Sequence, residues 1–279
     1  MAAVAEDLSL PCEHLFLAQP CLDWAVRCPD GGQVSVTSWR SPGHDGTNED
    51  AAMVIWPAPH RMVLAVADGV GGLPGGDSAS SLALHALRDA LRVRLAGGAD
   101  LREAILSGFD RANRAVLQRG IGSATTLAVV EIDDERMRSY HVGDSGVLVF
   151  GGRGKVRLQT IPHSPVGYAM EAGVLDEQQA MAHADRHLVS NVVGDRAMHV
   201  GMSYPLRLKP LDTVLLASDG LFDNAYTDEV IEHLRKGVLH EAAGRLARYC
   251  HARMGAARDG APSKPDDLTL VAYRPGIRR

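Results

Sequence analysis

Hydrophobic and polar residues alternate, or apolar residues run together, over three short stretches near the start of the chain. Residues 33–39 place Val34 and Val36 between polar neighbours, a period of two that predicts a β-strand. Residues 51–56 and 62–67 are almost continuously apolar, which indicates strands that are buried on both faces. We therefore expect three strands before residue 70.

An apolar residue at every third or fourth position predicts two helices in the next part of the chain. The first begins near Asp77, which we expect to cap it, and continues to about residue 95. The second begins at Asp100, which is followed three positions later by Glu103 in the manner of a capping box, and ends before Gly120. The two helices are expected to form one layer.

The rest of the chain returns to strands and then alternates between loops, helices and strands. Successive hairpins indicate an antiparallel sheet, with strands at residues 125–132, 137–142, 147–150 and 155–160. Residues 162–195 are loop-like apart from a short helix at 176–183, and we interpret them as a flap-like insertion. The remaining elements are a strand at 213–217, helices at 227–236 and 240–254, and a last strand at 268–273.

Helices cluster between runs of strands, which favours an α+β sandwich over a doubly wound sheet. A length of 279 residues is compatible with one large domain. Residues 1–32 are rich in Pro, Cys and Gly and show no sustained period. We predict an irregular N-terminal extension or an irregular first strand there, and a single domain over residues 33–279.

Composition narrows the classes of partner. A net charge of -5 and a pI near 6.2 give no basic surface for a phosphate backbone, which argues against nucleic acid. No apolar run reaches the roughly 18 residues that a membrane span needs. Glu6 and Asp7 near the start are unlike the basic segment of a secretory signal. We expect a soluble, cytoplasmic protein with no membrane partner.

Five short acidic motifs stand where the predicted strands begin or end. Each alone is more often an ordinary turn, roughly four times in five. Together they favour a divalent-metal site, because hard cations such as Mg²⁺ and Mn²⁺ prefer oxygen ligands and take few carboxylates from the protein. The alternative is a set of solvated turns or a structural Ca²⁺ site. The motifs lie at residues 48–50, 67–72, 143–146, 218–223 and 266–269.

These motifs, in this order, resemble those of the metal-dependent protein phosphatases of the protein phosphatase 2C type, in a bacterial form. The likeness runs from residue 34 to residue 273 and includes residues 123–126 and the flap-like segment. It implies a four-layer α-β-β-α sandwich of two antiparallel sheets flanked by helices. It also implies a serine/threonine phosphatase that hydrolyses phosphoserine or phosphothreonine by attack of a metal-bridging water, without a covalent phosphoenzyme.

The resemblance further implies two Mn²⁺ or Mg²⁺ ions in each chain, and a weaker third site. Asp50 would support the centre from beside it, and Asp267 stands where the family often has Asn and is not counted as a ligand. The implied ligands are Asp68 bridging both ions, Glu49 and the carbonyl of Gly69 on one ion, Asp219 and Asp266 on the other, and Asp144 and Asp223 with Asp219 at the third site.

The chain departs from the family pattern near the substrate phosphate. Many relatives have an Arg four residues before the position of Glu49, and here that residue is Asp45. An Asp cannot supply the bidentate grip of a guanidinium, so Arg40 or His44 is a candidate replacement. Two readings follow: a phosphatase acting on the phosphorylated protein substrates of a serine/threonine kinase, or a catalytically weak regulatory protein that binds phosphoproteins.

Overall fold

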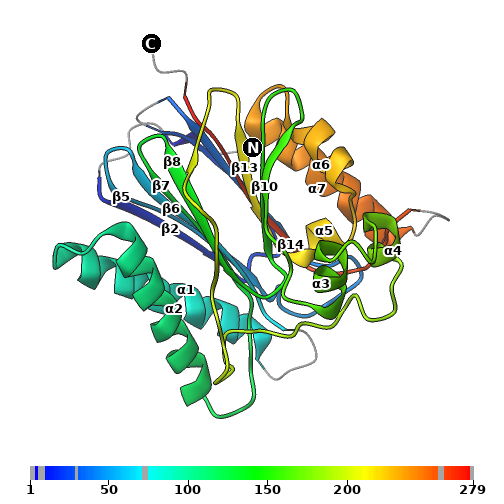
Figure 1. The fold of residues 1–279 in the computed structure, drawn as a ribbon, viewed down its shortest axis with the longest axis horizontal. Coiled ribbons are helices and arrows are strands. Elements are labelled where there is room, and N and C mark those ends of the chain that lie inside the picture. Colours follow the sequence, from blue (N-terminus) through cyan, green and yellow to red (C-terminus); the bar gives the residue numbers. More distant parts are fainter. Residues whose placement is uncertain (1–3, 6–9, 29–30, 71–74, 257–260, 277–279) are drawn as a thin grey trace.

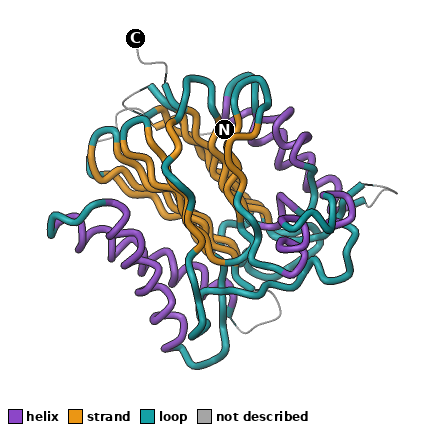
Figure 2. Tube along the Cα trace, in the orientation of Figure 1, coloured by secondary structure: helices purple, strands orange, loops and turns teal. Residues whose placement is uncertain are grey.

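Two β-sheets lie face to face between two outer layers of helices (Figure 1). This computed structural model describes residues 4–5, 10–28, 31–70, 75–256 and 261–276. The strands of both sheets form the middle of the molecule, with helices on either side of them (Figure 2). The α+β sandwich expected from the grouping of the elements is confirmed.

The first sheet, called sheet A, has seven strands. Its neighbours pair antiparallel, apart from the parallel pair β1 and β3. In spatial order the strands are β1 (Val4–Ala5), β3 (Cys21–Arg27), β4 (Gln33–Trp39), β14 (Leu268–Arg274), β13 (Thr213–Ala217), β9 (Gly146–Phe150) and β10 (Val156–Gln159).

The second sheet, called sheet B, is antiparallel throughout. Its strands β5 and β6 are buried along most of their length, as their apolar runs predict. In spatial order the strands are β11 (Gly201–Met202), β8 (Arg136–Val142), β7 (Leu127–Asp133), β6 (Arg61–Asp68), β5 (Asp50–Ala58) and β2 (Cys12–Leu17), and β12 (Leu206–Arg207) also pairs with β8.

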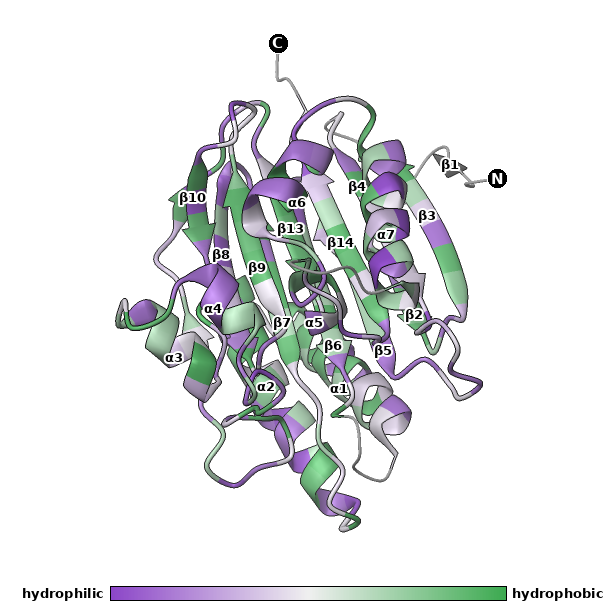
Figure 3. Ribbon diagram, turned by 90° about the vertical axis from the view of Figure 1, so that its right-hand side faces the viewer, coloured by the Kyte–Doolittle hydropathy of each residue, from purple (hydrophilic) through white to green (hydrophobic). Residues whose placement is uncertain are grey.

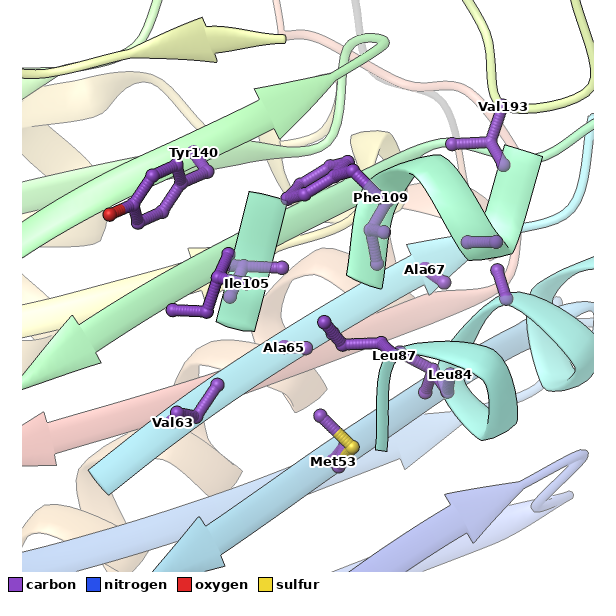
Figure 4. Close-up of a cluster of buried hydrophobic side chains, with 14 of the residues drawn as sticks. Met53, Val63, Ala65, Ala67, Leu84, Leu87, Ile105, Phe109, Tyr140 and Val193 are labelled. Atoms are coloured by element: carbon purple, nitrogen blue, oxygen red, sulfur yellow. The ribbon is translucent and has the colours of Figure 1, made fainter. Parts of the chain in front are cut away.

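The helices form the two outer layers. Helices α1 (Gly76–Ala96) and α2 (Leu101–Gln118) pack on sheet B, where Leu87 and Phe109 meet Met53 and Tyr140 (Figure 4). Helices α5 (Asp219–Phe222), α6 (Thr227–Leu234) and α7 (Leu239–Gly255) pack on sheet A. The strands are largely apolar in Figure 3, whereas α6 and α7 carry polar bands. A further apolar cluster fills the space between the sheets.

The structure confirms the predicted cap of α2 and corrects the predicted cap of α1. Asp100 caps α2 as predicted, by accepting a hydrogen bond from the Glu103 backbone N–H at 2.7 Å. The cap of α1 is Gly75 instead of Asp77, which lies in the first turn. Inside the flap-like segment, the short helix α4 (Glu177–Met181) was predicted and α3 (Pro165–Glu171) was not.

Two strand predictions are wrong. The described part of residues 1–32 is not irregular, because β2 and β3 extend sheets B and A. Successive strands β8 and β9 do not continue one sheet: the chain crosses from sheet B to sheet A between them. Both sheets bury their facing sides, so an apolar pattern alone does not say to which sheet a strand belongs.

Within the described ranges, no helix is both long and apolar enough to cross a membrane.

Candidate metal centre

The acidic motifs gather at one end of the sandwich. The chain passes between the two sheets at this end from β2 to β3, from β4 to β5, from β8 to β9 and, through the flap-like segment, from β10 to β11. Strands β6 and β13 finish here and β14 starts here, because neighbouring antiparallel strands share their ends. This geometry brings together acidic residues that are up to 217 positions apart in sequence, from Glu49 to Asp266.

One half of this centre is built by sheet B and contains Glu49, Asp50 and Asp68. Asp50 and Asp68 face each other in the register of β5 and β6. Asp50 is buried: its Oδ2 accepts a hydrogen bond from Ser218 Oγ at 2.8 Å, and its Oδ1 has no hydrogen-bond partner among the described residues. The hydroxyl of Thr126 accepts from the Asp68 backbone N–H at 3.0 Å. Among the described residues, the groups that donate hydrogen bonds to the Asp50 carboxylate are uncharged hydroxyls.

Gly69 lets the backbone after Asp68 pass close to the first turn of α1. Its N–H donates to the Glu49 carbonyl at 3.2 Å. A Cβ atom on Gly69 would lie 2.4 Å from the carbonyl carbon of Gly76, so a side chain does not fit there. The same close approach puts the start of α1 beside the Glu49 carboxylate, where the helix dipole favours negative charge.

Asp267 is a positioning residue that the sequence prediction left out. Its Oδ1 accepts from the Ser41 N–H at 2.8 Å, and its Oδ2 accepts from the Glu49 N–H at 2.6 Å. Both carboxylate oxygens are therefore used to hold the segment before β5. The Asp-Asp pair at 266–267 is visible in the sequence, but the sequence does not say which of the two carboxylates faces the backbone of residues 41–49.

The other half of the centre is built by sheet A and its connections, and it contains a cation. The Lys264 ammonium forms ion pairs with Asp219, with Asp223 at 3.0 Å and with Asp266 at 3.2 Å. Asp219 Oδ1 is buried and has no hydrogen-bond partner among the described residues. Sequence analysis missed Lys264, because a single lysine in a Pro- and Gly-containing loop gives no indication that it faces inward.

Burial and mutual repulsion raise the pKa values of these carboxyl groups. Burial is the largest cause for Asp68, whose pKa lies well above its usual range, and the nearby Asp50 and Asp219 raise it further. Burial, Asp219 and Asp223 raise the pKa of Asp144 to about 8. Burial and Asp219 raise the pKa of Asp266 to about 7, although Lys264 opposes the rise. So many carboxyl groups in one buried place require cations or protons.

The donor chemistry of the centre fits hard divalent cations, since it offers carboxylate oxygens, including the unpartnered oxygens of Asp50 and Asp219. The positions of the side chains fit a metal ion less well than their chemistry does. Over the described residues, no three His, Cys, Asp or Glu side chains form a group that could hold a metal ion as they stand. On the sheet A side, the cation that the carboxylates surround is Lys264.

A cavity of about 120 Å³ lies between the sheet A half of the centre and the flap-like segment. Asp144, Asp219 and Asp223 line it on one side. The flap-like segment contributes apolar side chains, such as Met170 and Met181, together with charged ones. The lining of the cavity thus combines carboxylates of the centre with apolar and charged groups of the flap-like segment.

A histidine cluster connects the flap-like segment to the connection that carries Asp144. The His163 ring stacks on His141, with 4.3 Å between ring centroids, and lies 4.9 Å from His199. Its Nδ1 accepts from the Gly143 N–H at 3.3 Å and from Asn191 Nδ2 at 2.8 Å, so Nδ1 carries no proton. Burial, followed by the neighbouring histidines, lowers the pKa of His163 to about 4.

The candidate phosphate-gripping residues lie in the loop before β5. Arg40 donates to the Gly46 carbonyl at 3.0 Å and so is engaged with the loop itself. The His44 ring also packs against Gly46. Neither side chain contacts the carboxylates through a hydrogen bond or ion pair that the structure records for the described residues.

Comparison with known proteins places the chain beside a set of bacterial enzymes. A family model described as "Protein phosphatase 2C" matches residues 41–251. Protein phosphatase PhpP of Streptococcus pneumoniae is 29% identical over 198 residues, which cover 68% of this chain and 80% of that protein. Serine/threonine phosphatase stp of Listeria monocytogenes is 26% identical over 205 residues, which cover 70% and 81% respectively.

Solved structures agree on the fold. The Mycobacterium tuberculosis serine/threonine phosphatase PstP/Ppp is similar with a TM-score of 0.71 at 24% identity, covering 87% of this chain and 98% of that one. A structure of the catalytic domain of PstP in complex with two manganese ions has a TM-score of 0.70 at 23% identity, covering 87% and 97%. The sandwich is therefore shared at low sequence identity.

Proposed function

The chain belongs to the protein phosphatase 2C family of serine/threonine phosphatases, and on this premise we propose that it hydrolyses phosphoserine and phosphothreonine in proteins at the acidic centre. One observation carries the proposal: five acidic segments from distant parts of the chain meet at one end of the sandwich. Four of the five lie within the residues that the family model matches.

The carboxylates are proposed to hold two Mn²⁺ or Mg²⁺ ions, with a third weaker site. Bound ions of this kind supply an activated bridging water for in-line attack at phosphorus. Asp68 would serve both ions, Glu49 and the Gly69 carbonyl one of them, and Asp219 and Asp266 the other. Asp144 and Asp223 belong to the weaker site.

Groups around the carboxylates keep them in place. Asp267 fixes the start of β5 through the backbone of Ser41 and Glu49. Ser218 holds the buried Asp50, which lies beside Asp68. Such outer hydrogen bonds orient ligands and are typically worth about 10–100-fold in affinity or activity.

The substrate proposed is a phosphorylated protein, the product of a serine/threonine kinase. The side chains of Met170 and Met181, which line the same cavity as the carboxylates, suit an apolar side chain next to the phosphorylated residue. We expect no nucleic-acid or membrane partner, because the chain has a net charge of -5.

The test measures phosphate release from matched phosphoserine, phosphothreonine and phosphotyrosine peptides by the Mn²⁺-loaded protein, in water enriched in ¹⁸O. We expect release from the first two peptides, with one ¹⁸O atom in each phosphate and no phosphorylated protein trapped by acid quenching. Tight binding of a phosphopeptide without release would instead support the regulatory, phosphoprotein-binding function.

A further inference from the structure

Lys264 is held in the acidic centre by its backbone as well as by its side chain. The Lys264 N–H donates to Asn224 Oδ1 at 2.8 Å, and Asn224 Nδ2 donates to the Lys264 carbonyl at 2.8 Å. Asn224 is fully buried and also donates to the Gly220 carbonyl at 2.9 Å, in the helix that begins with Asp219. The lysine is therefore fixed relative to the carboxylates that it contacts.

The residue before Lys264 is also tied to the body of the protein. The Ser263 hydroxyl donates to the Arg253 carbonyl at 2.9 Å, at the end of α7. The Ser263 carbonyl accepts from Arg186 Nη2 at 3.0 Å, from the flap-like segment. These contacts hold the residue that precedes Lys264, so the inward position of the lysine is fixed by its backbone.

The ammonium contacts oxygens that a divalent ion would need. It pairs with Oδ2 of Asp219 and with Oδ2 of Asp266, the two proposed ligands of one ion, and with Oδ2 of Asp223 from the weaker site. Two cations repel each other strongly at such short distances in a partly buried place. A divalent ion that binds these oxygens, or the unpartnered Asp219 Oδ1 on the same carboxylate, therefore meets the charge of the ammonium.

We propose that Lys264 is a built-in cation that competes with the divalent ion for Asp219 and Asp266, so that loading of this side of the centre requires the ammonium to leave. The inference rests on the proposed function, because it takes these carboxylates as metal ligands. It makes the two ions unequal: among the described residues Glu49 and Asp68 form no ion pair, whereas the ion on the Asp219 side must displace the Lys264 ammonium.

The first test measures Mn²⁺ binding to chelator-treated protein by calorimetry. Lys264→Met keeps most of the side-chain length and removes the charge, and Lys264→Arg keeps a charge. Lys236→Met is the matched control, since it removes one charge from an exposed lysine two residues after the end of α6. We expect Lys264→Met to tighten the weaker of the two Mn²⁺ affinities by about tenfold or more, while Lys236→Met leaves both unchanged and Lys264→Arg does not tighten either.

The second test needs no variant and follows the native protein. A short pulse of acetic anhydride, read by peptide mapping, reports how exposed each lysine amine is. We expect Lys264 to be protected in the chelated protein and to become reactive as Mn²⁺ is added, with Lys236 reacting equally in both states.

The outcomes distinguish the competition by Lys264 from the proposed phosphatase activity. Two Mn²⁺ ions bound with the same affinities in Lys264→Met as in the native protein, together with Lys264 reactivity that Mn²⁺ does not change, would overturn the competition and leave the proposed phosphatase intact. A native protein that binds no Mn²⁺ at all would overturn both.

Discussion

The two halves of the acidic centre solve the same electrostatic problem differently. On the sheet B side, Asp50 and Asp68 lie opposite each other with hydroxyl and backbone groups as neighbours. On the sheet A side, Asp219, Asp223 and Asp266 surround the Lys264 ammonium. Uncharged donors only partly compensate a buried carboxylate, whereas a cation compensates it directly. The sheet B half therefore depends more on bound metal than the sheet A half does.

The largest expected effect comes from removing one carboxylate from each half. Asp68→Asn and Asp219→Asn should each lower kcat/KM for a phosphothreonine peptide by about a thousandfold, since each removes a proposed ligand. In chelator, however, Asp68→Asn should raise the melting temperature because it relieves repulsion with Asp50, and Asp219→Asn should not because it also removes an ion pair.

The control is Asp110→Asn, an exposed carboxylate on α2. It should change neither activity nor melting temperature. Equal shifts in melting temperature for Asp68→Asn and Asp219→Asn would show that the halves do not differ as described.

A second prediction concerns the residue that links the halves. Asp267 directly precedes β14 of sheet A, but its carboxylate accepts a hydrogen bond from the Glu49 backbone of the sheet B half. Asp267→Ala removes both acceptors and should lower kcat/KM and Mn²⁺ affinity about 10–100-fold. Asp267→Asn keeps one acceptor oxygen and should lie between Ala and the native protein. Steady-state kinetics that rank Asn below Ala would refute this role.

A third prediction uses the histidine cluster, which lies outside both halves. His163 has a folded pKa of about 4 against 6.5 when unfolded, owing to burial and then to His141 and His199. The unfolded chain therefore binds the proton more readily. The contribution of His163 to the free energy of unfolding is fully present above pH 6.5 and is lost as the pH drops from 6.5 through 4, by about 3 kcal/mol.

His163→Gln should flatten this part of the stability profile, measured as urea unfolding free energy at a series of pH values. His187→Gln, at an exposed position in the same segment, is the control and should follow the native profile. Comparing each variant with the native protein at the same pH cancels the contribution of the acidic centre. An unchanged slope in His163→Gln would contradict the prediction.

The smallest expected effect tests the loop before the sheet B half. Asp45 is exposed and stands four residues before Glu49, where the resemblance to the family leads us to expect an Arg. Asp45→Arg should lower KM for a phosphothreonine peptide about two- to fivefold, because an exposed charged contact is worth little. Asp45→Asn, which only removes the negative charge, separates attraction by Arg from relief of repulsion. A KM that rises in Asp45→Arg would show that this loop does not face the phosphate.

The sequence predicted most elements because their periods were long and regular. Strand β13 was predicted with its observed bounds, and the Asp100 cap of α2 was read from local pattern alone. Strands β2, at the edge of sheet B, and β3, next to the last strand of sheet A, were missed because their partly exposed residues lack a sustained apolar period. The crossing between β8 and β9 was missed because sheet membership is set by long-range packing.

The residues of the candidate site could likewise be predicted only in part. The structure brings the acidic motifs to one end of the sandwich, as the resemblance implied, while the ligand roles themselves remain predictions. Lys264 could not have been predicted, because its inward position depends on Asn224, 40 residues earlier. Asp267 was recognised as a departure, but its two backbone partners lie more than 200 positions away.

The most direct test of the central claim is metal restoration of activity. Protein stripped with a chelator and freed of it by gel filtration is given a phosphothreonine peptide, and phosphate release is followed as Mn²⁺ or Mg²⁺ is added. We expect no release before metal is added, and release that rises in step with metal binding in the native protein and not in Asp68→Asn. Release that proceeds at full rate in the stripped protein, or that Asp68→Asn restores equally well, would contradict it.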